Sequence, residues 1–184
     1  DGRPTLRLSA RDLVESVLAV NPECLVIPAH IWTPWYGILG SRSGFDSLEE
    51  CFLDMAPHVG AVETGLSSDP AMNWNIYELD GRTIVSFSDA HSLVNLGREA
   101  TVFRGCLSYR GLAQALATQG VAYTIEFYPE AGKYHFSGHR NCGVRQGVRE
   151  ALDSAGRCPV CGRDLTLGVM HRVAALSHCD VPGG

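Results

Sequence analysis

The sequence predicts an α/β fold of alternating helices and strands, followed by a small lobe of different composition. Two observations carry this prediction. Up to about residue 130, short apolar runs typical of buried strands alternate with amphipathic segments typical of helices. Beyond Pro129 the sequence becomes rich in Gly, Arg, Cys and His. We therefore expect two domains, covering residues 1–130 and residues 131–184.

The expected elements are bounded by capping residues and by Gly or Pro. Helices are expected over residues 10–20, 47–55, 108–119 and 168–178. Strands are expected over residues 24–29, 61–64, 83–87 and 121–128. Because the two kinds of element alternate, the pattern favours parallel βα units over a sandwich or a helical bundle.

Composition narrows the class of protein. The chain has 184 residues, of which 45% are apolar and 19% charged, as in a globular protein rather than a disordered one. No apolar run approaches the roughly 18–20 residues that span a bilayer, and the first residues do not resemble a signal peptide. We expect a cytoplasmic protein without a membrane partner. The cysteines outside metal-type spacing are interpreted as small buried hydrophobes: Cys24, Cys51, Cys106 and Cys179.

Charge is distributed unevenly along the chain. The net charge is -5, yet residues 133–172 hold seven Lys or Arg against three acids. A basic lobe beside an acidic, metal-binding body suits an enzyme that acts on phosphodiesters. The alternative interpretation is an ordinary solvated surface.

The strongest motif is a pair of short Cys/His turns. His139 and Cys142 are separated by two residues, as are Cys158 and Cys161, with fifteen residues between the pairs. This is the spacing of a four-ligand structural Zn²⁺ site. A small lobe buries little core by itself, so a metal would stabilise it. Two other histidines could replace His139 or contact a phosphate: His135 and His171.

A second group of candidate ligands follows the expected strands. His30 follows residues 24–29, and Asp89 and His91 follow residues 83–87. In a parallel α/β barrel such positions converge on one open face, where catalysis takes place. A carboxylate and two imidazoles could hold metals that activate water and neutralise a phosphate. Glu63 also ends an expected strand, as a ligand or as a buried acid. The alternative for the group is hydrogen-bonded structural residues.

Two further segments could bind a substrate. Trp32 and Trp35 lie in an aromatic, Gly-rich loop, and they could stack on a base or belong to the core. The polar loop 67–73 offers Ser67, Ser68 and Asn73 to a polar ligand. Its alternative is a capped turn before a helix.

Several long motifs resemble a known family. They cover nearly the whole chain: Pro28-Ala-His-Ile-Trp-Thr-Pro-Trp35, Glu63-Thr-Gly-Leu-Ser-Ser-Asp-Pro70, Ser88-Asp-Ala-His91, Gly97-Arg-Glu-Ala100 and Thr124-Ile-Glu-Phe-Tyr-Pro-Glu-Ala-Gly-Lys-Tyr-His135. These motifs resemble endonuclease Q, a DNA-repair nuclease family of the polymerase-and-histidinol-phosphatase (PHP) superfamily.

The resemblance implies the C-terminal part of a distorted (βα)7 PHP-type barrel with a small zinc-binding lobe. The family cuts the phosphodiester bond 5′ of hypoxanthine, uracil or an abasic site, with a flipped-out nucleotide and divalent metals. His30, Asp89 and His91 match the metal motifs of the superfamily, which implies catalytic Zn²⁺, Mg²⁺ or Mn²⁺. The four Cys/His ligands match its zinc lobe.

One departure from the family pattern limits the number of metal ligands that this chain supplies. The first His-x-His motif and an early Glu ligand are absent, which implies that about the first third of the enzyme is missing and that a helical region follows Gly184. Three ligands are few for a centre of two or three metals.

We expect a metal-dependent DNA-repair endonuclease, in which Lys133 and Arg140 grip the DNA backbone. Damaged DNA is the expected partner, and other repair or replication proteins form a second class of partner. One alternative is a PHP-type phosphoesterase that acts on a small phosphorylated metabolite, which the basic segment 133–172 disfavours. The other is a non-catalytic, zinc-stapled module that binds nucleic acid.

Overall fold

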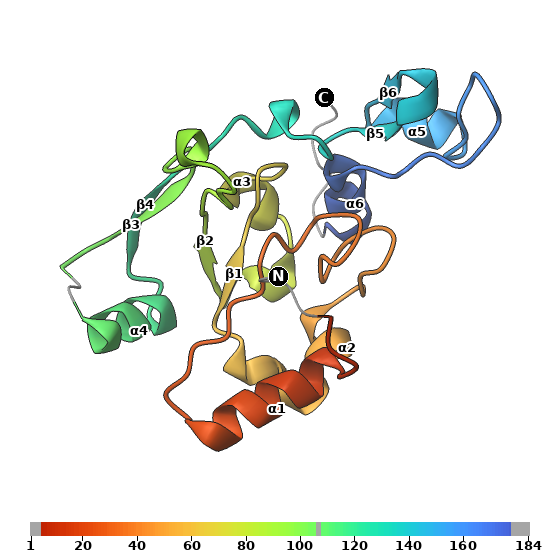
Figure 1. Ribbon diagram of the computed structural model, residues 1–184. Helices are drawn as coiled ribbons and strands as arrows, with labels where there is room; N and C mark the ends of the chain where they lie inside the picture. Colours follow the sequence, from red (N-terminus) through yellow and green to blue (C-terminus); the bar gives the residue numbers. More distant parts are fainter. Residues whose placement is uncertain (1–4, 106–107, 178–184) are drawn as a thin grey trace.

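A computed structural model describes residues 5–105 and 108–177 of the chain. Figure 1 shows a body of helices around short strands, with a lobe formed by β5, β6 and α5 beside it. The interpretations of Cys106 and Cys179, and the last residues of the expected lobe, lie outside the described residues.

The N-terminal helices begin where their capping residues predicted. Helix α1, Ala10–Val20, begins after Ser9, whose Oγ accepts a 3.0 Å hydrogen bond from the backbone N–H of Asp12. Helix α2, Leu48–Phe52, begins after Ser47, whose Oγ accepts from the N–H of Glu50. The segment then continues as the 3₁₀-helix Leu53–His58, so the last three residues of the expected helix 47–55 are not α-helical.

A buried parallel strand pair forms the centre of the body. Strands β1, Ala61–Glu63, and β2, Thr83–Val85, pair in parallel, and all their residues are buried. The strand expected over residues 24–29 was wrong, because these residues form no paired strand. Its end still lies beside β1, because the N–H of Glu63 donates to the carbonyl of Pro28 at 3.1 Å. Proline has no N–H to return, which limits the ladder on this side.

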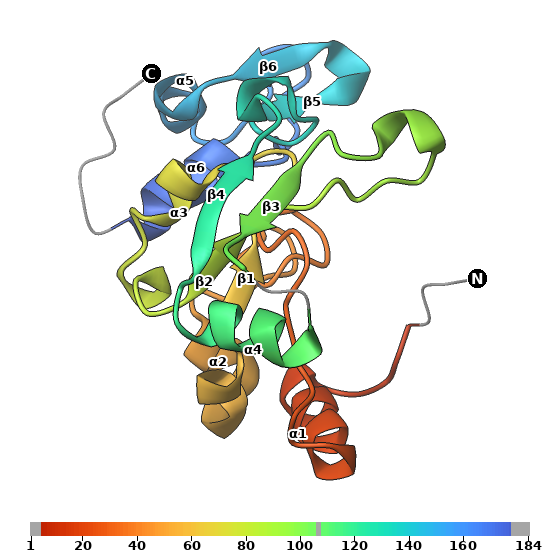
Figure 2. The same ribbon diagram turned by 90° about the vertical axis from the view of Figure 1, so that its left-hand side faces the viewer.

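The second strand pair corrects the expected direction. Strands β3, Ala100–Phe103, and β4, Val121–Ile125, pair antiparallel although helix α4, Tyr109–Ala117, connects them. A helical connection is long enough to return the chain to either end of a neighbouring strand, so alternation alone did not determine direction. Figure 2 shows this pair above α4.

Short elements complete the connections. Helix α3, Pro70–Asn73, begins after Asp69, whose Oδ1 accepts from the N–H of Met72 at 2.8 Å. Single 3₁₀ turns occur at Tyr77–Leu79, Leu93–Asn95, Pro129–Ala131 and Arg140–Cys142.

The predicted α/β class is confirmed, whereas a closed barrel is not seen. The described residues form three separate two-stranded sheets, β1 with β2, β3 with β4, and β5 with β6. The PHP-type barrel therefore stays a prediction about a longer assembly of strands.

The main apolar core lies under the N-terminal half. It joins Val14 of α1, Trp32, Leu48 of α2 and Val62 of β1 to Val173 of helix α6. Helix α6, Val169–Leu176, matches the expected helical segment 168–178. It packs into this main core although it lies within residues 131–184, and the domain boundary near residue 130 stays a prediction.

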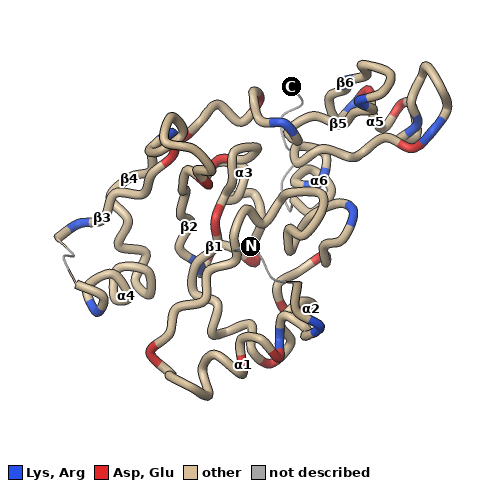
Figure 3. Tube along the Cα trace, viewed as in Figure 1, with Lys and Arg blue, Asp and Glu red and all other residues tan. Residues whose placement is uncertain are grey.

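The lobe is small and nearly without a core of its own. Strands β5, Ser137–His139, and β6, Val144–Gln146, pair antiparallel beside helix α5, Val148–Asp153. Its buried apolar cluster consists of Ala151, Cys158 and Leu165. Figure 3 shows several Lys and Arg positions along it. Across the described chain, every helix is too short or too polar to span a bilayer.

Candidate functional site

The four predicted Cys/His ligands converge in the lobe. The ligand atoms of His139, Cys142, Cys158 and Cys161 all lie within 4.8 Å of one another. The Nδ1 of His139 is 3.3 Å from the Sγ of Cys161. Tetrahedral zinc, with bonds of about 2.0–2.3 Å, holds its ligand atoms roughly 3.3–3.8 Å apart. The group therefore fits Zn²⁺ after a small contraction, in agreement with the predicted structural metal.

Two similar turns present these ligands. His139 ends β5 and Cys142 ends the following 3₁₀ turn, after which Gly143 takes a left-handed φ of 64°. The second turn follows Cys158, whose carbonyl accepts from the N–H of Gly162 at 2.8 Å, and Gly162 has a φ of 71°. Each two-residue spacer is thus closed by a glycine that tolerates the left-handed conformation.

The thiols perturb one another. Burial, together with the neighbouring thiols of Cys161 and Cys158, raises the pKa of Cys142 to about 11. Burial also acts to raise the pKa of Cys158, but the N–H groups of Cys161 and Val160 and the ring of His139 lower it to about 6. Thiolates this close repel one another, so a bound cation is needed to ionise them together.

The alternative fourth ligands lie elsewhere. His135 is buried, and its Nδ1 lies 3.0 Å from the carbonyl oxygen of Ser67. His171 lies in α6, where burial lowers its pKa. His139 is the histidine that joins the three cysteines in the described part of the chain.

The predicted barrel ligands sit on strained turns. His30 and Asp89 have left-handed φ values of 35° and 43°, which are uncommon for residues with a side chain. A Cβ on Gly65 would lie 2.6 Å from the Cβ of His30, so Gly65 allows this turn to pack against β1. The Nδ1 of His91 lies 2.8 Å from the carbonyl oxygen of Asp89.

Glu63 connects His30 to the sheet. The N–H of His30 donates a 2.6 Å hydrogen bond to the Oε2 of Glu63. Burial raises the pKa of Glu63, the charge of Asp89 adds to the rise, and His30 opposes it. Within residues 5–105 and 108–177, His30, Asp89 and His91 do not form a converged group like that of the lobe. Their metal-binding role stays a prediction.

Four of the predicted substrate residues are buried. The Nε1 of Trp32 donates to the Oδ1 of Asn73 at 2.8 Å, and the Nδ2 of Asn73 donates to the carbonyl of Asp69 at 2.7 Å. The Oγ of Ser68 donates to the carbonyl of Thr64. Ser67 is buried too, and its Oγ accepts from the N–H of Tyr134. These bonds give the residues a structural role here, and substrate contact by them stays a prediction.

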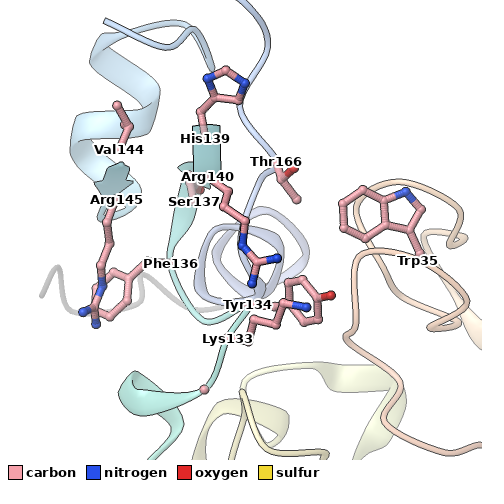
Figure 4. A pocket seen from close by; sticks show the side chains of 12 residues that line it. Trp35, Lys133, Tyr134, Phe136, Ser137, His139, Arg140, Val144, Arg145 and Thr166 are labelled. Carbon is pink, nitrogen blue, oxygen red and sulfur yellow. The ribbon is translucent and has the colours of Figure 1, made fainter. Parts of the chain in front are cut away.

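The other three predicted substrate residues line one cavity. Trp35, Lys133 and Arg140 border a cavity of about 350 Å³ between the aromatic loop and the lobe. Figure 4 shows Lys133 and Arg140 on one side of this space and Trp35 on the other. The rest of its lining is Gly132, Tyr134, Phe136, Ser137, Gly138, His139, Val144, Arg145 and Thr166. Among the described lining residues there is no carboxylate.

The sequence reasoning missed the two aromatic lining residues Tyr134 and Phe136, whereas Arg145 lies in the basic segment 133–172 that it singled out. The guanidinium of Arg145 lies 3.8 Å from the ring centroid of Phe136, and the Nζ of Lys133 lies 4.9 Å from that of Tyr134. The ring of Tyr134 also meets Trp35 edge to face at 6.1 Å. Basic residues interleaved with aromatics over 133–145 were the available signal. Such a cavity can bind phosphate through its cations and stack on a planar group.

Searches for relatives found no matching family model. The chain is 34% identical to the uncharacterised protein YqxK of Bacillus subtilis, over 94% of this chain and 45% of that protein. It is 32% identical to an uncharacterised protein of Methanocaldococcus jannaschii, over 79% of this chain and 19% of that protein. The chain thus spans less than half of the curated relatives it matches.

Two solved structures share the fold. One is the lesion-specific endonuclease Q of Pyrococcus furiosus, with 28% identity and a TM-score of 0.79 over 97% of this chain and 44% of that one. The other is endonuclease Q in complex with a 27-mer duplex substrate that carries an abasic lesion at the active site. It has 28% identity and a TM-score of 0.78, over 100% of this chain and 46% of that one.

Proposed function

This chain belongs to the endonuclease Q family, and from that premise we propose that it is part of a metal-dependent DNA-repair endonuclease. The observation that carries the proposal is the likeness to endonuclease Q over essentially the full chain, in sequence and in fold together. The basic, aromatic cavity beside the zinc cluster supports a nucleic-acid substrate. It also disfavours a small phosphorylated metabolite, which would need a more enclosed site.

The lobe would hold DNA through its backbone. Zinc held by His139 and its partner cysteines would fix β5 and the turn after it, and this turn carries Arg140. Arg145 lies opposite Gly138 in the β5–β6 ladder, so the same zinc site would orient it. The guanidinium groups then meet phosphates, while Trp35 offers an exposed ring to a base or a deoxyribose.

We assign the cutting chemistry to the carboxyl ends of the parallel strands β1 and β2. His30, Asp89 and His91 would hold divalent ions, with Glu63 bracing the His30 turn through the hydrogen bond to its N–H. When bound, such ions activate water and stabilise charge on the phosphate. The proposed cut lies 5′ of a deaminated or abasic nucleotide in a flipped-out conformation. Residues 1–130 would supply part of a barrel and residues 131–184 the zinc lobe.

One observation favours a second candidate for the isolated chain. The zinc ligands converge, whereas His30, Asp89 and His91 do not form such a group among the described residues. A zinc-stapled module that binds DNA without cutting it would show this arrangement.

The test is incision of labelled duplexes by the longer parent protein with Mg²⁺ or Mn²⁺. Each duplex carries one deoxyinosine, deoxyuridine or abasic site, and an undamaged duplex is the control. We expect cleavage 5′ of the lesion that is lost on Asp89→Ala and retained on Asp80→Ala, which changes an exposed acid outside the proposed metal site.

The outcomes separate the candidates. Incision that survives Asp89→Ala would contradict the assigned metal site. Lesion-specific binding without incision, from folded and zinc-loaded protein with every metal, would favour the non-catalytic module. If the folded protein neither binds nor cuts the damaged duplexes, the DNA proposal is rejected.

A further inference from the structure

The Asp89 turn begins on a segment that no strand ladder holds. Strand β2 ends at Val85, and residues 86–90 belong to no helix or strand. Among the described residues, β1–β2 and β3–β4 are separate sheets, although Figure 1 shows the β3–β4 pair beside β2, on the side away from β1. Ser86 is completely buried, so its backbone N–H and carbonyl need partners other than those of a ladder.

One side chain of β3 supplies both partners. The N–H of Ser86 donates to the Oγ1 of Thr101 at 2.9 Å, and the same hydroxyl donates to the carbonyl of Ser86 at 2.9 Å. A hydroxyl carries one donor and two acceptor lone pairs. A single threonine side chain therefore makes the pair of bonds that a neighbouring strand would otherwise exchange with Ser86. Thr101 thus links the end of β2 to β3.

The side chain of Ser86 is held from two further strands. Its Oγ donates at 2.7 Å to the Oε1 of Glu126, which directly follows β4. The hydroxyl of Thr64, which follows β1, lies 2.7 Å from the same Oγ. Because Ser86 gives its one hydroxyl proton to Glu126, the Thr64 hydroxyl is the donor in this contact. Every polar group of Ser86 is therefore bonded, and side chains from three neighbouring strand regions fix its position.

The same segment has a second anchor closer to the turn. The Nε of Arg98 donates to the carbonyl of Ser88 at 2.8 Å. Asp89 follows directly, with its left-handed φ of 43°. A residue with a side chain keeps such a conformation only where the surrounding structure over-determines it. The bonds at Ser86 and Ser88 supply that constraint.

We propose that Thr101 is a positioning residue, which holds the Asp89 turn in its left-handed conformation through the two bonds to Ser86. The inference deepens the proposed function and rests on it, because the cutting chemistry is assigned there to the residues of this turn. Thr101→Ser keeps the hydroxyl, whereas Thr101→Val removes it at nearly the same volume and suits a strand equally well. The valine leaves the buried N–H and carbonyl of Ser86 without partners.

The first measurement uses this chain, zinc-loaded, and needs neither DNA nor a catalytic metal. In Thr101→Val, the Ser86 amide should exchange its hydrogen about tenfold faster than in the wild type. The strong intraresidue HN–Hα NOE of Asp89 that marks a positive φ should weaken. Thr101→Ser should keep both signals. Thr124→Val is the matched control, since Thr124 pairs with Thr101 across the ladder and is not among the residues bonded to Ser86.

The second measurement is incision of a damaged duplex by the longer parent. Thr101→Val should raise the Mn²⁺ concentration that gives half-maximal incision by about tenfold, because it displaces the turn that carries Asp89. A simple loss of folded protein would not move this concentration. The KM for DNA should stay the same, since the basic cavity of the lobe is untouched. Thr101→Ser should restore the wild-type Mn²⁺ requirement.

The outcomes separate this inference from the proposed function. An unprotected Ser86 amide in the wild type, or unchanged Ser86 exchange and Asp89 NOE in Thr101→Val, would overturn the inference without any incision assay. An altered turn in a parent that still cuts with the wild-type Mn²⁺ requirement would overturn the positioning role. A wild-type parent that does not cut would reject the proposed function instead, while an altered turn would still support Thr101 as the residue that holds Asp89.

Discussion

The Nδ1 of His139 lies 3.3 Å from the Sγ of Cys161, although twenty-one residues separate them in the chain. This contact closes the lobe, because it joins the end of β5 to the Cys158–Cys161 turn. The lobe has little apolar core to replace it. We therefore expect its order to depend on the metal that these two residues and their neighbours would share.

The first prediction concerns that metal. Cys158→Ser should abolish binding of about one zinc per chain, because serine is a poor zinc ligand and Cys158 is the buried member of the cluster. Elemental analysis and the amide signals of β5 and β6 are the measurements. Cys24→Ser, outside the cluster, is the matched control. Full zinc occupancy in Cys158→Ser would contradict the assignment.

The second prediction concerns the turn that carries His30. Gly65→Ala should destabilise the fold by about 1–3 kcal/mol, because Gly65 has a φ of 71° and its new Cβ would lie 2.6 Å from the Cβ of His30. Urea unfolding gives the free energy. Gly60→Ala is the control, since a Cβ there meets nothing within 4 Å. Equal stability of the two variants would show that the His30 turn accommodates the new Cβ without a loss of stability.

The third prediction is a pH dependence of stability. The pKa of Glu99 rises from 4.5 to about 7 on folding, so its contribution is complete below about pH 4.5 and is lost as the pH rises through 7. Between pH 5 and 8, Glu99→Gln should therefore gain about 2–3 kcal/mol relative to wild type. Unfolding free energies measured across this range test the change. Parallel curves for the two proteins would be the contrary result.

The fourth prediction concerns the cavity beside the lobe and rests on the proposed function. In the longer parent, Arg140→Ala should weaken binding of duplex DNA similarly for all sequences and reduce the salt dependence by about one ion. Arg110→Ala changes a highly exposed arginine of α4, outside the cavity, and is the control. Fluorescence anisotropy at several salt concentrations measures both effects. An unchanged salt slope for Arg140→Ala would remove it from the DNA interface.

Local signals were sufficient for the starts of α1 and α2 and for the spacing of the Cys/His cluster. Ser9 and Ser47 cap α1 and α2 as their positions predicted, because a serine hydroxyl satisfies a free N–H wherever a helix starts. The zinc ligands were found from spacing, since a two-residue turn brings two of them together without help from the rest of the fold. His139 rather than His135 or His171 completes the group, and only its place beside the second turn shows this.

Strand direction and pairing were not available from local pattern. The antiparallel β3–β4 pair and the missing ladder at residues 24–29 depend on which backbone groups find partners across long loops. The same holds for Trp32, whose aromatic ring could have been exposed or buried by sequence alone. The fold places it in the core with its Nε1 on Asn73.

The sequence by itself determined the α/β class, the starts of α1 and α2, the three cysteines of the Cys/His cluster and the family resemblance, because each depends on short-range chemistry or on matched motifs. Tertiary structure decided which residues far apart in the sequence lie next to one another. It set Trp35 across the cavity from Arg140, turned His30 against Gly65, and bonded the Glu99 carboxylate to the N–H of Phe127. These relationships arise from packing and pairing over long separations, which no local pattern of side chains encodes.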